Sequence, residues 1–345
     1  MRSLSDTIRR LNARRNFTLP EFNLPTMSDL PNLSDLPGMP SLGQPSGALT
    51  PLDGFGSNPG ALSAFTHVPA DLPAGAPLVV VLHGCTQTAA AYDRGAGWSQ
   101  LADEHGFALL YPEQRRANNA NLCFNWFEPG DTRRDAGEAM SIRQMIAAMV
   151  RAHKLDANRI FVTGLSAGGA MTSVMLATYP EIFAGGAVIA GLPYGCATSV
   201  PEAFDRMRGH GTPTGAELGR RARSASAHDG PWPRVSVWHG SADTVVAPSN
   251  ALAVIDQWRE VHGIAPGAGA RDMVDGHERR RWTGHDGMAV IESYSVAGMG
   301  HGTPVNPTGD DGAGAVGPHM LAASISSTRH IARFFGVDRP RVNGG

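Results

Sequence analysis

Short apolar runs alternate with longer amphipathic segments from residue 61 to near the end of the chain. The runs are rich in β-branched and aromatic residues and predict strands at Leu78–Leu82, Phe107–Tyr111, Arg159–Leu165, Gly186–Ala190, Val235–Trp238 and Met288–Val296. Apolar residues at helical spacing predict helices at Trp98–His105, Asp135–His153, Gly168–Tyr179, Pro248–His262 and Pro318–Phe335. This alternation predicts an α/β fold with a doubly wound, mostly parallel sheet and helices on both of its faces.

The pattern is interrupted near the N-terminus and at two internal positions. Residues 1–60 carry eight prolines at short spacing, which predicts a largely irregular segment. That segment is either an extended linker or a stretch whose apolar side chains cover a hydrophobic surface, of the domain itself or of an insoluble substrate. Residues 61–338 form the expected α/β domain, and residues 339–345 a flexible tail. Insertions at Tyr194–Pro233 and Gly263–Gly287 are expected to lie over the sheet edge where such folds place their active sites.

Composition narrows the class of protein. The 345 residues include 17% charged and 42% hydrophobic side chains, an ordinary globular balance. The net charge of −2 gives no basis for binding nucleic acid, and no apolar stretch reaches the roughly 18–20 residues that a membrane span needs. The basic N-terminus is not followed by the apolar core of a secretory signal, so we expect a cytoplasmic protein. A single lysine and the lack of paired His or Cys ligand motifs predict neither a metal nor a cofactor.

The segment around Ser166 combines a strand, a turn and a helix without interruption. Arg159-Ile-Phe-Val-Thr is followed by Gly164-Leu165-Ser166-Ala167-Gly168 and then by a helix-forming run. The G-x-S-x-G pattern in that context is typical of a nucleophile elbow, in which a sharp turn exposes the serine hydroxyl. Ser166 is therefore the candidate nucleophile, and a glycine-rich packing turn is the alternative interpretation.

A serine nucleophile needs a base and a group that orients the base, and both follow later strands in this arrangement. Asp243 follows the strand at Val235–Trp238, in the turn His239-Gly-Ser-Ala-Asp243, and is the candidate acid. His301 follows the last strand in a glycine-rich loop and is the candidate base. His285 is a rival, but it precedes that strand and so belongs to the opposite edge of the sheet.

The negative charge that forms on an attacked carbonyl oxygen needs two backbone N–H donors. We expect them at Ala167, directly after the nucleophile, and at Cys85, in the loop after the strand at Leu78–Leu82. His83 in the same loop is expected to hold the loop rather than to act as a base. The candidate substrate-binding residues are Trp126, Gln87 and Leu165.

Four motifs occur in sequence order: Leu82-His-Gly-Cys-Thr-Gln87, Cys123-Phe-Asn-Trp-Phe127, Gly164-Leu-Ser-Ala-Gly-Gly-Ala-Met171 and Gly191-Leu-Pro-Tyr-Gly-Cys196. Together they resemble the poly(3-hydroxybutyrate) depolymerase family of esterases, a branch of the α/β-hydrolases related to feruloyl and acetyl xylan esterases. The resemblance runs from about residue 61 to the end of the last helix. It implies a Ser-Asp-His triad at Ser166, Asp243 and His301, an oxyanion site at Cys85 and Ala167, and a substrate crevice that includes Trp126.

These residues predict a serine esterase, a carboxylic ester hydrolase that works through an acyl-enzyme. The resemblance favours poly(3-hydroxybutyrate), its oligomers or short-chain esters as the substrate. A feruloyl or acetyl xylan esterase with the same triad is the first alternative. A non-catalytic protein that binds polymer granules is the second.

The three cysteines are too few for a disulfide scaffold. In the expected reducing compartment Cys85, Cys123 and Cys196 are all inert thiols. Alternatively, Cys85 and Cys123 lie close enough for a disulfide that braces the oxyanion loop against the loop of Trp126. The sequence leaves both alternatives open.

Overall fold

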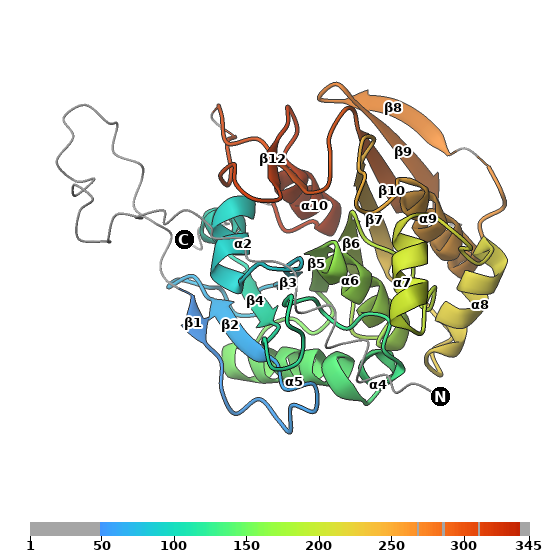
Figure 1. Cartoon of the computed structure of the whole chain (residues 1–345). Helices are drawn as coiled ribbons and strands as arrows, with labels where there is room; N and C mark the ends of the chain where they lie inside the picture. The colour runs from blue at the N-terminus through green and yellow to red at the C-terminus, as the bar shows by residue number, and fades with distance from the viewer. Residues whose placement is uncertain (1–48, 268, 285–286, 310, 339–345) are drawn as a thin grey trace, which may run out of the picture. The chain divides into compact units, whose positions relative to one another are not determined.

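A computed structural model of the protein describes residues 49–338, except for residues 268, 285–286 and 310. Within these residues, ten strands form one mixed sheet in the order β1-β2-β4-β3-β5-β6-β7-β10-β9-β8 (Figure 1). They are β1 (Thr50–Pro51), β2 (Ser63–His67), β3 (Leu78–Leu82), β4 (Ala108–Glu113), β5 (Ile160–Leu165), β6 (Gly185–Ile189), β7 (Arg234–Gly240), β8 (Ala270–Val274), β9 (His277–Thr283) and β10 (Ala289–Val296). Two further short strands, β11 (Thr303–Val305) and β12 (Met320–Ala322), pair with each other.

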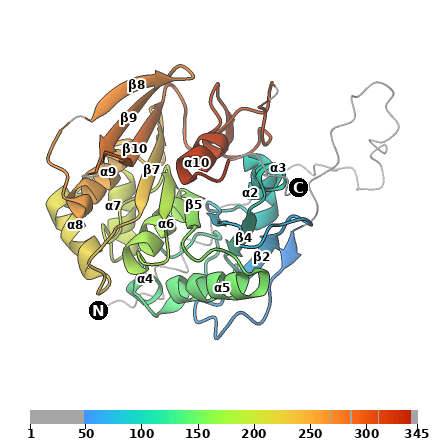
Figure 2. The same cartoon turned by 180° about the vertical axis from the view of Figure 1, so that it is seen from behind.

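The helices lie on both faces of the sheet, as Figures 1 and 2 show from opposite sides. They are α2 (Ala89–Ala96), α3 (Trp98–His105), α4 (Pro129–Thr132), α5 (Gly137–His153), α6 (Ala167–Thr178), α7 (Val200–Met207), α8 (Gly215–Ser224), α9 (Ser249–His262) and α10 (Ser327–Phe335). The central strand β3 is buried along its whole length. Its residues Leu78, Val80 and Leu82 belong to the core with α5, α6 and α9, whereas Val79 and Val81 belong to the core with α2, α3 and α10. Two cores explain why the strand is a continuous apolar run rather than an alternating one.

The expected doubly wound, mostly parallel sheet is confirmed. Adjacent strands from β4 through β3, β5, β6 and β7 to β10 are parallel, and the strands beyond them on either edge are antiparallel. The expected bounds at Leu78–Leu82 and Trp98–His105 match the structure, and most of the other predicted elements agree to within about two residues at each end.

The helix predicted over Pro318–Phe335 is wrong in its first half. The helix α10 begins only at Ser327, where the Ser326 hydroxyl caps it by accepting a hydrogen bond from the Arg329 N–H. Before it, Gly317 and Met320 close a tight turn, and Met320–Ala322 form β12. Apolar residues at helical spacing gave no sign of that turn, because strand and helix patterns cannot be told apart over a run of three residues.

The N-terminal part that the structure describes joins the α/β domain from residue 50 onward, eleven residues before the expected start at residue 61. Thr50 and Pro51 pair with β2. Asn58 N–H donates to Gln144 Oε1 at 2.8 Å, and Gly60 N–H donates to Ser141 Oγ at 2.8 Å, both on α5. The proline-rich part over residues 1–48 and the tail over residues 339–345 lie outside the described residues.

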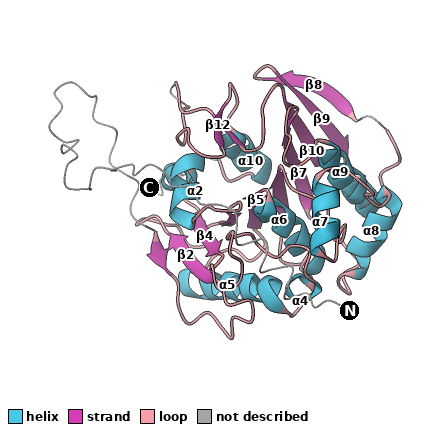
Figure 3. Cartoon of the chain, viewed as in Figure 1, coloured by secondary structure: helices cyan, strands magenta, loops and turns pink. Residues whose placement is uncertain are grey.

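The two insertions differ in their position. The first, Tyr194–Pro233, contains α7 and α8. The second, Gly263–Gly287, contains β8 and β9, a hairpin that pairs with β10 and extends the sheet at its edge (Figure 3). The second insertion therefore widens the sheet, contrary to the expectation that both insertions cover the active site.

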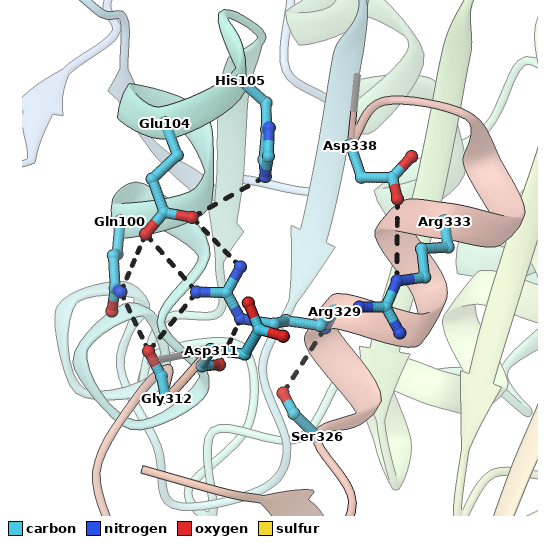
Figure 4. A network of polar contacts seen from close by, with 9 residues as sticks. All are labelled: Gln100, Glu104, His105, Asp311, Gly312, Ser326, Arg329, Arg333 and Asp338. Carbon is cyan, nitrogen blue, oxygen red and sulfur yellow. Dashed lines mark hydrogen bonds and ion pairs between the residues drawn. The ribbon is translucent and has the colours of Figure 1, made fainter. Parts of the chain in front are cut away.

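Arg329 on α10 fixes the segment that connects β11 to β12. Its guanidinium forms an ion pair with Glu104 on α3, with Nη1 3.1 Å from Oε2, and its Nε donates to the carbonyl oxygen of Asp311 (Figure 4). Gln100 Nε2 donates to the Gly312 carbonyl at 3.0 Å. Because α3 and α10 both pack on the sheet, these contacts tie the segment after His301 to the core.

Candidate active site

Ser166 occupies a strained turn between β5 and α6. Its backbone has φ 57° and ψ −117°, a combination that L-residues rarely adopt. A Cβ atom at Gly164 would lie 2.4 Å from the carbonyl oxygen of Gly168, and one at Gly168 would lie 2.3 Å from the carbonyl oxygen of Leu82. The two glycines of the G-x-S-x-G pattern are therefore required by backbone contacts between β3, β5 and α6.

Asp243 and His301 lie in loops that follow β7 and β10, and the structure brings them together. His301 Nδ1 lies 2.7 Å from Asp243 Oδ2. The other carboxylate oxygen, Oδ1, accepts the N–H groups of Val245 and Val246, each at 2.9 Å. Because Nδ1 faces the carboxylate, Nε2 of His301 is the nitrogen available to a serine hydroxyl. The rival His285 lies outside the described residues.

The environment of Asp243 favours its ionised form. Burial alone would raise the pKa of this carboxyl, but hydrogen bonds from His239 and His301 and the backbone N–H of Val246 together hold the pKa of Asp243 below its ordinary value. An ionised carboxylate is the form that can orient an imidazole and stabilise its cation.

Sequence reasoning missed the part played by His239. This buried side chain at the end of β7 places Nε2 3.3 Å from Asp243 Oδ2 and 2.9 Å from the carbonyl oxygen of Val246. It therefore closes the turn that carries Asp243. The signal was available in His239-Gly-Ser-Ala-Asp243, where two residues that can pair stand four positions apart.

One cavity of about 460 Å³ is lined by most of the site residues that the sequence predicted. The predicted residues that line it are Ser166, His301, Cys85, Ala167, Trp126, Gln87 and Leu165. Trp98 and Trp238, by contrast, are buried in the core on the α10 side of the sheet. Asp243 lies behind His301, out of the cavity lining, as expected for a group that acts through the imidazole.

The loop after β3 carries Cys85 to the cavity and is held by a hydrogen bond on each side of that residue. On one side of it, Gly84 N–H donates to Gln87 Oε1 at 2.9 Å, and on the other, Thr86 N–H donates to the Asn121 carbonyl at 2.7 Å. Ala167 is the first residue of α6, so its N–H has no acceptor one turn earlier in the helix. Gln87 lines the cavity, but its amide oxygen is already engaged in shaping this loop.

A disulfide joins Cys85 to Cys123 and resolves the alternative that the sequence left open. It links the loop after β3 to the loop that carries Trp126. Cys196 is a free, buried thiol, and burial raises its pKa to about 12. The thiol of Cys196 is therefore unreactive at neutral pH.

His83 and Glu138 hold the same two loops through buried polar contacts. Burial lowers the pKa of His83 to about 4, so its ring is neutral, with Nδ1 donating to the Gly84 carbonyl at 2.8 Å and Nε2 accepting from Gln114 N–H at 3.1 Å. Gln114 Nε2 donates to the Cys123 carbonyl at 3.0 Å and to Glu138 Oε1 at 2.5 Å. Glu138 Oε2 accepts from Asn125 N–H at 2.9 Å. Burial and the neighbouring Asp131 raise the pKa of Glu138 to about 8.

The opposite side of the cavity is apolar and open to solvent. Helix α7 contributes Val200 and Phe204, which are 49% and 52% exposed, and the loop after β7 contributes Val245, which is 47% exposed. Sequence reasoning missed these three residues, since a short amphipathic helix in an insertion gives no sign of what it faces. Together we call them the apolar rim.

Two structural observations limit other kinds of site. Within residues 49–338 as described, there is no cluster of three or more His, Cys, Asp or Glu side chains that could hold a metal ion. Of the helices in that part of the chain, none has the length and apolar character needed to cross a membrane.

Comparisons with known proteins agree with this architecture. Residues 64–281 match the family model described as esterase PHB depolymerase, a stretch that includes Ser166 and Asp243 and ends before His301. The chain is 49% identical over 292 residues to poly(3-hydroxyalkanoate) depolymerase C of Paucimonas lemoignei, covering 84% of this chain and 70% of the relative. It is 34% identical over 271 residues to an acetylxylan esterase of Coprinopsis cinerea, covering 76% and 71% of the two chains.

Among solved structures, the acetyl xylan esterase from Aspergillus awamori superposes with a TM-score of 0.71 at 25% sequence identity. The match covers 84% of this chain and 100% of that one. The fold is thus that of the α/β-hydrolase esterases, as the sequence predicted. The chain belongs to the esterase PHB depolymerase family and is a carboxylic ester hydrolase.

Proposed function

We propose that the protein cleaves esters through an acyl-enzyme formed on Ser166. His301 takes the serine proton at Nε2 and returns it to the leaving alcohol, while Asp243 holds the imidazole through Nδ1. The N–H groups of Cys85 and Ala167 donate hydrogen bonds to the carbonyl oxygen as it becomes negatively charged. Water then attacks the acyl carbonyl carbon while His301 takes a proton from it; His301 returns that proton to Ser166 Oγ as the bond to the acyl group breaks, and the carboxylic acid is released. The observation that carries this proposal is the 2.7 Å contact between His301 Nδ1 and Asp243 Oδ2, with His301 facing the cavity of the strained Ser166.

Replacement of the nucleophile tests the proposal. Ser166→Ala is expected to lower kcat on a soluble p-nitrophenyl ester by about four orders of magnitude or more, since the residues of such a unit act together. Ser173→Ala is the matched control, because Ser173 lies on the same helix, fully buried and away from the cavity. If the Ser166 variant keeps its activity in a preparation free of wild-type enzyme, the mechanism is wrong.

For the substrate, we propose a polyester of short hydroxy acids, such as poly(3-hydroxybutyrate), or its oligomers. The first support is the 49% identity to a protein named a poly(3-hydroxyalkanoate) depolymerase. The second is the apolar rim, because a polysaccharide ester would need polar groups where Val200, Phe204 and Val245 lie exposed at the cavity. Contiguous exposed apolar side chains are typical of surfaces that bind a hydrophobic partner.

The rival substrate class is an acetylated or feruloylated polysaccharide. The similarity to proteins named acetylxylan esterases supports this alternative. Rates measured side by side on hydroxybutyrate oligomers, acetylated xylan and methyl ferulate separate the two classes. We expect the hydroxybutyrate oligomers to give the highest kcat/KM. A higher kcat/KM on acetylated xylan would assign the protein to the rival class, with the same mechanism.

The N-terminal segment is proposed to bind the surface of polymer granules. Its composition supports this role, since Leu-Pro pairs recur between residues 19 and 37. Deletion of residues 1–48 is expected to reduce sedimentation with polymer granules while the rate on a soluble ester stays the same. Unchanged sedimentation would leave the segment as a linker.

We also propose that the protein works in an oxidising compartment, in place of the cytoplasm expected from composition. Support comes from the disulfide between Cys85 and Cys123, because such bonds persist outside reducing compartments. Mass spectrometry of the unreduced protein, isolated with thiols blocked at lysis, is expected to find only Cys196 alkylated. Alkylation of all three cysteines would favour the cytoplasm.

A further inference from the structure

A second histidine, His319, lines the active-site cavity and has a backbone conformation that is unfavourable for residues other than glycine. His319 follows Pro318 in the tight turn closed by Gly317 and Met320, with hydrogen bonds of 3.0 Å and 2.9 Å between those two residues. Its φ is 59°. A turn with proline at its second position and a positive φ at its third usually places glycine or asparagine there. A residue kept in such a conformation at a cavity points to a function for its side chain.

The turn is held rigidly between the two catalytic loops. The His319 carbonyl accepts the Thr303 N–H at 2.8 Å, and the Pro318 carbonyl accepts Gln87 Nε2 at 3.4 Å. A Cβ atom at Gly302 would lie 2.7 Å from the His319 carbonyl oxygen, so the turn packs directly on the residue after His301. The backbone contacts would be made equally by glycine at position 319.

The imidazole of His319 retains hydrogen-bonding capacity. Its ring is exposed, and its centroid lies 6.0 Å from that of His301, with the planes at 78°. Within the described part of the chain its polar side-chain contact is Nδ1 to the His301 carbonyl at 3.5 Å, which is at the limit for a hydrogen bond.

Three other polar side chains of the cavity are already engaged. Gln87 Oε1 accepts the Gly84 N–H, Asn119 Oδ1 accepts the N–H groups of Asn121 and Cys123, and the Thr86 hydroxyl donates to the Cys85 carbonyl.

We propose that His319 is a specificity-determining residue that donates a hydrogen bond to the carbonyl oxygen of the ester unit next to the one being cleaved. The inference rests on the proposed function, since a polyester carries a carbonyl in each repeat whereas a simple ester carries one. The mostly apolar cavity accommodates the aliphatic part of the repeat, and the imidazole beside His301 supplies a donor one unit away. His319 thereby distinguishes oligoesters from single esters without taking part in proton transfer.

The test compares His319→Gly with Lys154→Gly in the full chain. Lys154 is the C-cap residue after α5 and has φ 52°, so both substitutions relieve a positive φ, and Lys154 is outside the cavity lining. Neither variant is expected to lower Tm. His319→Gly is expected to lower kcat/KM on a methyl ester of a hydroxybutyrate trimer by about 3- to 10-fold, mainly through KM, which is the effect of losing one hydrogen bond. The rate on p-nitrophenyl acetate is expected to change by less than about twofold.

The remaining outcomes separate this inference from the proposed mechanism. His319→Asn, which tolerates the positive φ and keeps a donor, is expected to recover part of the loss on the trimer. An unchanged trimer rate in His319→Gly, or an equal loss on trimer and acetate, would overturn the inference. Activity that survives in Ser166→Ala would overturn the mechanism instead. The ratio of the trimer rate to the acetate rate in His319→Gly would still test the role of His319.

Discussion

The two sides of the active-site cavity are built in opposite ways. On one side, the loops of Cys85 and Trp126 are joined by a disulfide, and His83 and Glu138 take part in buried hydrogen bonds that hold them. On the other side, the apolar rim of Val200, Phe204 and Val245 is about half exposed. In the proposed mechanism the first side holds the Cys85 N–H, and the second side presents apolar surface to solvent.

The difference follows from the kind of interaction that each side makes. An N–H group that stabilises a developing charge must be held within about 0.5 Å of its productive position, which requires directional and covalent supports. Contact with an apolar polymer is non-directional and scales with area, so it requires exposed side chains rather than fixed ones. The comparison therefore predicts chemical defects from one side and adsorption defects from the other.

The largest effect on kcat is expected from a change at Asp243, the acid that contacts His301. Asp243→Asn keeps an oxygen for the N–H groups of Val245 and Val246 but presents an NH₂ group to His301 Nδ1, which favours the wrong tautomer. By analogy with such triads, kcat on a soluble ester should fall by about 10³- to 10⁴-fold with little change in KM.

A similar carboxylate–imidazole pair outside the cavity provides the control for this variant. His330 Nε2 lies 2.9 Å from Asp275 Oδ2, and Asp275→Asn is expected to leave kcat unchanged. A comparable loss of kcat in both variants would mean that the Asp243 effect is one of general stability.

The next largest effect is expected from the loss of the disulfide between Cys85 and Cys123. Replacing Cys85 and Cys123 together by serine opens a loop of sequence separation 38 and is expected to lower the free energy of unfolding by about 2–4 kcal/mol. In the proposed mechanism the same bond positions the Cys85 N–H, so kcat should fall as well. Urea unfolding and kinetics on a soluble ester measure the two effects, with Cys196→Ser as the control. An unchanged kcat in the double variant would contradict the assignment of this side to chemistry.

An effect that depends on pH is expected from His83. Its pKa in the folded protein is about 4, below the ordinary 6.5, so the unfolded chain binds more protons between these values. Its contribution to stability is thus complete above pH 6.5 and is lost as the pH falls toward 4, by up to about 1.4 kcal/mol per pH unit. His83→Gln is expected to flatten this dependence in urea unfolding from pH 4 to 7.

His262 allows the stability effect to be separated from the effect on catalysis. Burial lowers its pKa to about 4 as well, and it bonds the Pro233 carbonyl, outside the cavity. His262→Gln should flatten the pH dependence equally and leave kcat unchanged, whereas His83→Gln should also lower kcat. If His83→Gln leaves kcat unchanged, the buried network does not position the oxyanion loop.

The sequence predicted which loops carry the candidate catalytic residues, but it did not predict the apolar rim. Ser166, Asp243 and His301 could be placed because parallel strands bring their carboxyl ends to one edge, and the order of elements fixes which loops meet there. Gly164 and Gly168 were informative because backbone atoms approach them to within 2.5 Å of where a Cβ would be. The first of these constraints comes from the order of strands and helices, and the second from a short local motif. Both can be recognised in the sequence.

Other features could not be recognised in this way. The sequence left the disulfide as one of two alternatives, because the bond depends on two loops 38 residues apart meeting in space. The turn at His319 was hidden in a run that fits a helix. Helix α7 was not foreseen because its exposed Phe204 depends on how an insertion folds back over the cavity. Long-range packing decided each of these, and a pattern of period 2 or 3.6 does not record it.

The smallest effect on soluble chemistry is expected from the apolar rim, and it gives the sharpest test of the comparison. Phe204→Ser should change kcat/KM on a soluble p-nitrophenyl ester by less than about twofold, while the rate on a poly(3-hydroxybutyrate) film falls several-fold because less apolar area contacts the surface. Leu252→Ser is the matched control, because Leu252 is 58% exposed on α9 but does not line the cavity. If both variants lose the same rate on the film, adsorption depends on exposed apolar area anywhere on the protein. A loss confined to Phe204→Ser would show that the polymer meets the enzyme at the cavity mouth, opposite the braced loops.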